Sequence, residues 1–224
     1  MDMFASSTAF AAAPSTMPAS SDASAALVAA AASFLDHLAH GRAVDTPALR
    51  AAMFDAFGGS DAEGAWDWKT GYDACEAATV LFLRRFGPGM RGRAGSPAPL
   101  LAMLAKVAAL LPSHTRRSEE SQALQQFSTP IALGFSAATA AAITPADLVL
   151  EPSAGTGLLA IFAELAGGRL VLNELAETRA ALLRRLFPDV PVTRHDAAQI
   201  DDHLDLTARP SRSEEHTSEL QSPA

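Results

Sequence analysis

The chain has 224 residues, enough for one domain of average size or two small ones. Its 17 lysine and arginine residues against 25 aspartate and glutamate residues give a net charge of −8, which argues against a broad basic surface for nucleic acid. The single cysteine, Cys75, excludes an internal disulfide framework and a cysteine-based zinc site. The histidines show no metal-ligand spacing, so we expect no metal. No apolar run reaches the roughly 18 residues of a membrane span, so we expect a cytoplasmic protein without a membrane partner.

The N-terminal segment, residues 1–24, consists mostly of alanine, serine, threonine and proline. Such a composition buries too little apolar surface to offset the entropy lost on ordering, and it predicts a disordered arm. Asp2 stands where a secretory signal peptide would carry positive charge, and no compact apolar region follows it. We therefore do not interpret this segment as a signal peptide.

The C-terminal stretch from Arg212 to Ser222 resembles a translated sequencing adapter. All eleven of its residues, RSEEHTSELQS, match the adapter read codon by codon. We interpret residues 212–224 as a non-native tail and exclude them from the fold expected of the natural protein. This interpretation implies that the natural protein continues where the tail begins.

Residues 25–112 are expected to form a helical domain. Apolar side chains recur there at helical spacing in four segments, at about 26–38, 47–57, 73–86 and 97–111. Thr46 is expected to cap the second helix, and Gly58 to end it. The Gly-Pro-Gly sequence at 87–89 is expected to break the third helix.

Residues 113–211 change character and alternate short strands with helices. After a helix that Thr129-Pro130 is expected to open, apolar runs predict strands near 148–150, 170–172 and 191–193, with helices near 157–166 and 177–187 between them. This alternation predicts an α/β fold with a parallel, Rossmann-like sheet. Such a sheet normally has five or more strands, so we expect the domain to be incomplete.

A glycine-containing turn follows the first of these strands. The glycines Gly155 and Gly157 allow a backbone to approach a ligand without a clashing Cβ, and with Ala160 they match the loose dinucleotide-binding pattern. Glu151 lies four residues before Gly155, however, and its carboxylate would repel a pyrophosphate. A carboxylate at this place suits a ligand that carries an ammonium and a sulfonium group, which is the case for S-adenosylmethionine.

Two further acids follow the next two strands. Glu174 lies about 20 residues after the glycine turn, where an acid can accept hydrogen bonds from ribose hydroxyls. Asp196 follows the third strand and is placed to meet the amino group of an adenine. The three acids therefore predict a nucleoside site at the carboxyl ends of the strands.

The segment Glu151-Pro-Ser-Ala-Gly-Thr-Gly157 resembles the first motif of S-adenosylmethionine-dependent methyltransferases of the DNA adenine type. Upstream, Phe127-Ser-Thr129-Pro resembles their aromatic-x-Thr-Pro motif, which closes over the cofactor. The longer stretch 66–205 resembles the N-terminal part of bacterial strawberry notch-like proteins, in which a methyltransferase-like domain precedes a helicase-type ATPase. Together with the acids, the resemblance implies cofactor contacts from Phe127, Thr129, Glu151, Pro152, Ala154, Gly155, Gly157, Glu174 and Asp196.

The motif that holds the methyl acceptor in this family, Asn/Asp-Pro-Pro-aromatic, does not occur in the sequence. Neither does the Walker motif of an ATPase. We therefore assign no catalytic residue and expect the chain itself to be inactive. The resemblance implies that a longer, helicase-linked protein methylates an amino group, with DNA as its partner.

Two other hypotheses stay open. The domain can be a degenerate module that binds the cofactor or docks DNA for a helicase without methyl transfer. The glycine pattern also fits a nicotinamide-dependent oxidoreductase, which would bind NAD and not S-adenosylmethionine. Against all of these stands a purely structural interpretation, in which Gly155 and Gly157 only form a turn and Thr129 only caps a helix.

Overall fold

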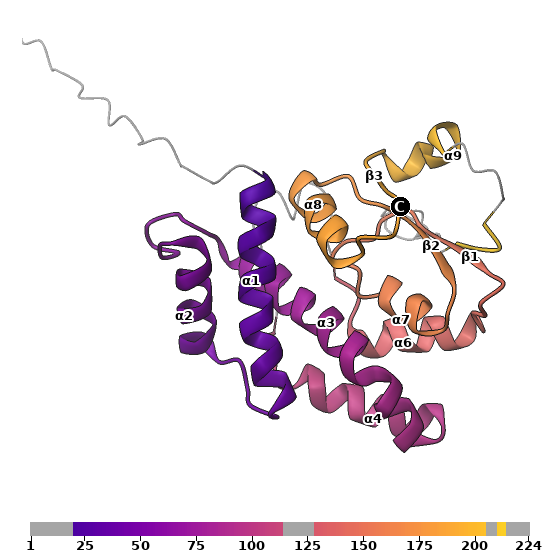
Figure 1. The fold of residues 1–224 in the computed structure, drawn as a ribbon, viewed down its shortest axis with the longest axis horizontal. Coiled ribbons are helices and arrows are strands. Elements are labelled where there is room, and N and C mark those ends of the chain that lie inside the picture. Colours follow the sequence, from indigo (N-terminus) through magenta and orange to yellow (C-terminus); the bar gives the residue numbers. More distant parts are fainter. Residues whose placement is uncertain (1–19, 114–127, 205–209, 214–224) are drawn as a thin grey trace, which may run out of the picture.

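The computed structural model describes residues 20–113, 128–204 and 210–213. The helices are α1 (Ser20–Ala39), α2 (Thr46–Phe57), α3 (Trp68–Ala94), α4 (Pro97–Ala108), α6 (Ile131–Ala140), α7 (Ala160–Leu165), α8 (Glu177–Leu186), the 3-10 helix η1 (Ala197–Gln199) and α9 (Ile200–His203). The strands are β1 (Leu148–Glu151), β2 (Arg169–Asn173), β3 (Val192–Thr193) and β4 (Arg212–Ser213). The fold is thus mixed α/β, with N-terminal helices followed by a small parallel sheet interleaved with helices (Figure 1).

The sheet has the order β3-β2-β1-β4, and all of its strand pairs are parallel. Helix α7 connects β1 to β2, and α8 connects β2 to β3. In the register, Glu151 lies opposite Leu172, and Asn173 lies opposite Thr193. Since the strands are parallel, their carboxyl ends and the turns that follow them meet at one edge of the sheet. The strand and helix order expected for this part of the chain is confirmed.

The fourth strand was not expected, because it consists of residues interpreted as a non-native tail. Arg212 and Ser213 pair with Val149 and Leu150 of β1, and Ser211 N donates to Leu148 O at 2.9 Å. The free edge of β1 presents unpaired backbone groups, which any extended segment can satisfy whatever its side chains. This two-residue pairing does not depend on the identity of the side chains, so the interpretation of residues 212–224 as a non-native tail stays a prediction.

A continuous hydrophobic core joins the N-terminal helices to the sheet. Leu27 and Phe34 of α1, Leu83 of α3, and Leu183 and Phe187 at α8 belong to the same buried cluster. Figure 1 shows α3 running from beside α1 to the region below α7. No helix in the described part of the chain is long and apolar enough to cross a membrane.

The first two helices begin differently from the expectation. Helix α1 begins at Ser20, several residues before the expected end of the arm, because Ala23 and Ser24 are buried against the rest of the molecule. Asp45, not Thr46, caps α2, since its Oδ1 accepts a hydrogen bond from Ala48 N at 2.9 Å. The predicted end of α2 is confirmed, with Gly58 in the left-handed conformation at φ +72°.

Helix α3 passes through the Gly-Pro-Gly sequence that was expected to break it, and it ends only at Gly95. Pro88 lacks the N–H that would bond to the preceding turn, which costs stability in a helix interior. The packing of α3 against α7 opposes this cost: Gly87 lies so close to Leu165 that an added Cβ would come within 3.0 Å of its Cδ1. Helix α3 therefore continues past Pro88, with its next turns packed against α7.

Candidate functional site

The turn after β1 is built on two glycines with different surroundings. Gly155 has φ +58° and Gly157 has φ +88°, both in the left-handed region that other residues rarely adopt. A Cβ on Gly157 would lie 2.5 Å from Cε2 of Phe187, so packing alone requires glycine there. A Cβ on Gly155 would meet nothing within 4 Å. Gly155 thus faces open space, as a position that contacts a ligand must.

Glu174, directly after β2, holds this turn. Its Oε2 accepts a hydrogen bond from Gly155 N at 2.8 Å, and its Oε1 accepts one from Ala176 N at 2.8 Å. The side chain is buried, and burial raises the pKa of the carboxyl group although the two amides and nearby Arg179 oppose the rise. The predicted acid therefore lies at the glycine turn, and its first contact within the chain is with the turn's backbone.

Asn173, the last residue of β2, joins the three strand ends and was missed by the sequence analysis. Its Nδ2 donates to Pro152 O at 2.8 Å and to His195 O at 2.9 Å, while its Oδ1 accepts from His195 N at 2.9 Å. Thr193 Oγ1 also donates to Asn173 Oδ1 at 2.9 Å. The side chain is fully buried. An asparagine beside an acid at a strand end was the signal available in the sequence.

Helix α3 contributes two buried acids to the same edge, and neither was predicted. Glu76 Oε2 accepts a hydrogen bond from Oγ1 of Thr156, the residue between the two glycines, at 2.5 Å. Asp73, one helical turn earlier on the same face, is 1% exposed. The glycine turn is therefore hydrogen-bonded to Glu76 of α3 through Thr156 and to Glu174 through the N–H of Gly155.

Asp73 forms an ion pair with Arg179 of α8. Arg179 Nη2 donates to Asp73 Oδ1 at 2.7 Å and its Nε donates at 3.2 Å, while Lys69 Nζ donates to Oδ2 at 3.2 Å. Burial by itself would raise the pKa of Asp73, but the charges of Arg179 and Lys69 outweigh it and lower the pKa below its ordinary value. Asp73 is thus held as a carboxylate, and it fixes the first turn of α8.

The predicted acids Glu151 and Asp196 differ in their exposure. Glu151 is buried at the end of β1 and lies at the same edge of the sheet as Gly155 and Glu174. Asp196 also follows a strand at this edge, but it is exposed and caps η1, its Oδ1 accepting from Ala198 N at 3.0 Å.

The upstream motif is only partly described. Phe127 lies outside the described residues. Thr129 is half-buried, and the residue at the N-cap position of α6 is Pro130, which makes no side-chain cap bond. Thr129 therefore does not cap α6 as expected, because the helix begins two residues after it.

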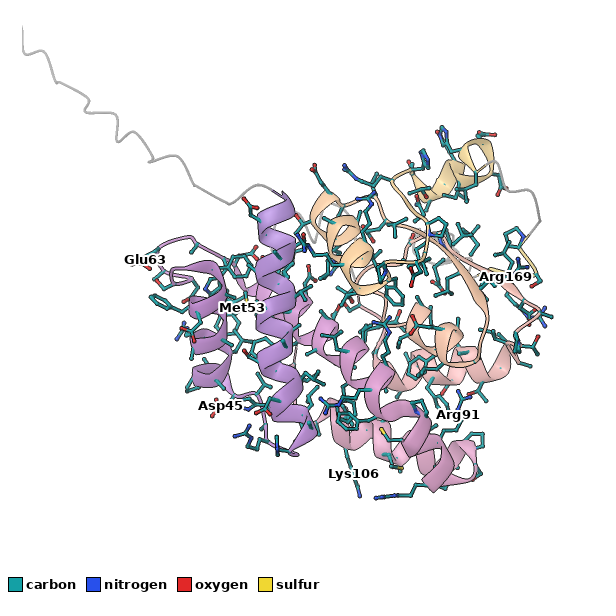
Figure 2. All side chains as sticks on the ribbon, viewed as in Figure 1. Asp45, Met53, Glu63, Arg91, Lys106 and Arg169 are labelled. Carbon is teal, nitrogen blue, oxygen red and sulfur yellow. The ribbon has the colours of Figure 1, made fainter. Side chains whose placement is uncertain are left out.

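Two hollows in the described part of the molecule lie away from this edge. Two adjoining cavities of about 310 and 320 Å³ lie between α3, α4, α6 and α7, and both are bordered by Arg91, Leu100, Phe135 and Phe162. Figure 2 labels Arg91 at this side of the molecule. Their lining is mostly apolar, and no acid borders them. Within the described residues, no group of histidine, cysteine or acidic side chains could hold a metal ion.

The chemistry of the strand ends is acidic. Four carboxyl groups are buried near the strand ends, those of Asp73, Glu76, Glu151 and Glu174. Lys69 and Arg179 both pair with Asp73, and Arg194 after β3 lies 3.6 Å from Glu177. Such a set suits a ligand that carries positive charge and hydroxyl donors, and it opposes a pyrophosphate. Helix α7 begins only at Ala160 and has six residues, so the turn does not lead directly into a long helix whose N-terminus could attract an anion.

Comparisons of the chain with protein-family models, with curated proteins and with solved structures found no significant match.

Proposed function

We propose that the chain binds S-adenosylmethionine at the carboxyl edge of its sheet, with the adenosine part beside Gly155 and Glu174. The observation that carries the proposal is the open space at Gly155, whose N–H is held by the carboxylate of Glu174 at the end of β2. A backbone without a Cβ beside an acid is suited to the close approach of a ribose and to acceptance of its hydroxyl hydrogens. Glu151 at the end of β1 would face the cationic methionine part.

The charge of the edge supports this ligand over NAD. A dinucleotide needs a helix N-terminus or basic groups at its pyrophosphate, whereas the described groups around the turn are mainly carboxyls. Two guanidinium groups lie near these carboxyls: that of Arg179 is buried and bonded to Asp73, and that of Arg194 donates to the carbonyl oxygen of Leu175 at 3.2 Å and lies 3.6 Å from Glu177. S-adenosylmethionine has a sulfonium and an ammonium group, so the same acids would attract it.

For methyl transfer, the proposal concerns a longer protein. The bound cofactor supplies a methyl group on a cationic sulfur, and the transfer requires chiefly that the acceptor be held in line with that bond. The sequence holds no Asn/Asp-Pro-Pro-aromatic motif to hold an amino group. We therefore propose cofactor binding for this chain, and amino-group methylation, with a DNA base as acceptor, for the longer helicase-linked protein that the motifs resemble. Cofactor binding or DNA docking without transfer is the second candidate, and an Asn/Asp-Pro-Pro-aromatic motif in the longer protein would argue against it.

Isothermal titration of the 224-residue chain tests the binding proposal. We expect S-adenosylmethionine to bind and NAD not to bind under the same conditions. Glu174→Gln should weaken binding by about tenfold or more, because the amide replaces an acceptor of charge-assisted hydrogen bonds. Glu177→Gln is the matched control, since Glu177 is an exposed acid at the start of α8, near Arg194 at 3.6 Å.

The outcomes separate the hypotheses. Binding of NAD alone would overturn the proposal in favour of an oxidoreductase. Absence of binding by either ligand, in a chain whose circular dichroism shows it folded, would mean that the glycine turn is only structural. An equal loss of affinity in both glutamate variants would show that net charge, and not the site, attracts the ligand.

A further inference from the structure

We infer that Glu76 of α3 is a positioning residue of the cofactor site, acting through Thr156 on the glycine turn. This inference rests on the proposed function, because it assigns the helical N-terminal part a role in the same site. Glu76 belongs to the wider stretch 66–205 of the resemblance, which assigned it no role, whereas the residues expected to contact the cofactor all lie after residue 126.

The contact between Glu76 and Thr156 is a buried hydrogen bond. Thr156 is flanked by the two left-handed glycines, the residue type with the widest choice of backbone conformations. Its hydroxyl donates to Glu76 Oε2 at 2.5 Å, and both side chains are buried. Because both groups are buried, loss of either partner would leave the other without this hydrogen bond, which is costly. The bond therefore adds a side-chain restraint to the middle of the turn, beside the backbone bond from Gly157 N to Ala154 O at 2.9 Å.

The bond between Thr156 and Glu76 belongs to a closed ring of contacts. From Thr156 the chain passes to Gly155, whose N–H is bonded to Glu174 Oε2 at 2.8 Å. Glu174 Oε1 accepts from the N–H of Ala176, the residue before α8, and Arg179 of α8 returns to α3 at Asp73. The glycine turn and the turn between β2 and α8 are thus both attached to one face of α3. A change at Glu76 will reach Gly155 through a single residue.

The bond to Glu76 also sets the direction in which the glycine turn is held. Thr156 points its hydroxyl into the protein, toward α3, while the adjacent Gly155 has open space where a Cβ would lie. Holding the side chain of one residue inward keeps the backbone of its neighbour outward, where a ligand can meet it. Without the bond, the turn can rotate about its glycines, and the ligand would have to select the productive conformation from several.

The experiment compares Thr156→Val, which has the same shape without a hydroxyl, with Thr156→Ser, which keeps the hydroxyl. We expect Thr156→Val to weaken S-adenosylmethionine binding about tenfold and Thr156→Ser to restore affinity to within about threefold of the wild type. Glu76→Gln combined with Thr156→Val should cost no more than Thr156→Val alone, since the two residues act through one bond. Equal affinity of the valine and serine variants would overturn the inference.

A second readout does not depend on the cofactor. The amide resonances of Gly155 and Gly157, followed by NMR together with their hydrogen exchange, should shift and lose protection in Thr156→Val but not in Thr156→Ser. If the wild type binds no S-adenosylmethionine while these amides respond as expected, the proposed function fails and the positioning role stands. If the amides are unchanged in the valine variant, the positioning role fails whether or not the cofactor binds.

Discussion

Replacement of Arg179 by methionine should strongly destabilise the protein. The guanidinium group is almost completely buried and donates from Nε and Nη2 to Asp73, which is itself 1% exposed. Removing one partner of a buried ion pair typically costs about 3–5 kcal/mol, because the other charge stays buried without it. Lys69 remains 3.2 Å from Asp73, so we expect a loss near the lower end, about 3 kcal/mol. This is a large part of the roughly 5–15 kcal/mol that holds a domain folded.

Urea denaturation followed by tryptophan fluorescence measures this loss, since Trp66 lies in the core. Arg42→Met is the control: Arg42 pairs with Asp36, and both side chains are more than half exposed, so the change should cost no more than about 1 kcal/mol. A free energy of unfolding for Arg179→Met within about 1 kcal/mol of the wild type would refute the reasoning, because the pair would then be as weak as an exposed one.

The same pair predicts a dependence on pH. Although burial raises it, the pKa of Asp73 is lowered overall by Arg179 and Lys69. A lowered pKa stabilises the folded state fully above the ordinary carboxyl value of 3.8, and this stabilisation is lost as the pH falls through the folded pKa. In Arg179→Met the burial is less opposed, so the pKa of Asp73 should rise and acid unfolding should begin at a higher pH than in the wild type.

The remaining predictions concern the glycines and two titratable groups. Gly157→Ala should lower the urea midpoint more than Gly155→Ala, because its Cβ would collide with Phe187 at 2.5 Å, whereas at Gly155 only the left-handed backbone, about 1 kcal/mol, is at stake. Burial raises the pKa of the Cys75 thiol, so a thiol reagent should modify it only when urea unfolds the chain. Hydrogen bonds lower the pKa of Asp147 to about 2, so NMR should find it ionised at pH 3, and its contribution to stability should be present above 3.8 and be lost as the pH falls toward 2.

The local parts of the fold could be predicted because neighbouring residues decide them. The alternation of apolar runs with polar turns fixes the order of strands and helices after residue 147, and glycines mark the turn after β1. The expected break at Pro88 was wrong because the fate of that proline depends on Leu165 of another helix. The cap of α2 at Asp45 was missed by one residue, since Asp45 and Thr46 are both good capping residues.

The residues of the candidate site also fall into some that the sequence could predict and some that it could not. Glu151, Gly155 and Glu174 could be placed together because they follow consecutive parallel strands. Asp73 and Glu76 could not, since about 80 or more residues separate them from their partners Arg179 and Thr156 and no periodicity connects them. In the sequence these acids have the spacing of an ordinary solvated helix face. Only the packing of α3 on the sheet turns that face inward.

This arrangement has a consequence for how the two parts of the chain fold. Asp73 and Glu76 come from the helical part, and the groups that satisfy them, Arg179 and Thr156, come from the sheet part. A buried charge without its partner is costly, so neither part can bury these polar groups without the other. The apolar core crosses the same boundary, from Phe34 to the helices on the sheet. The N-terminal helices and the glycine turn are therefore parts of one folding unit, and a ligand that binds the turn will stabilise both.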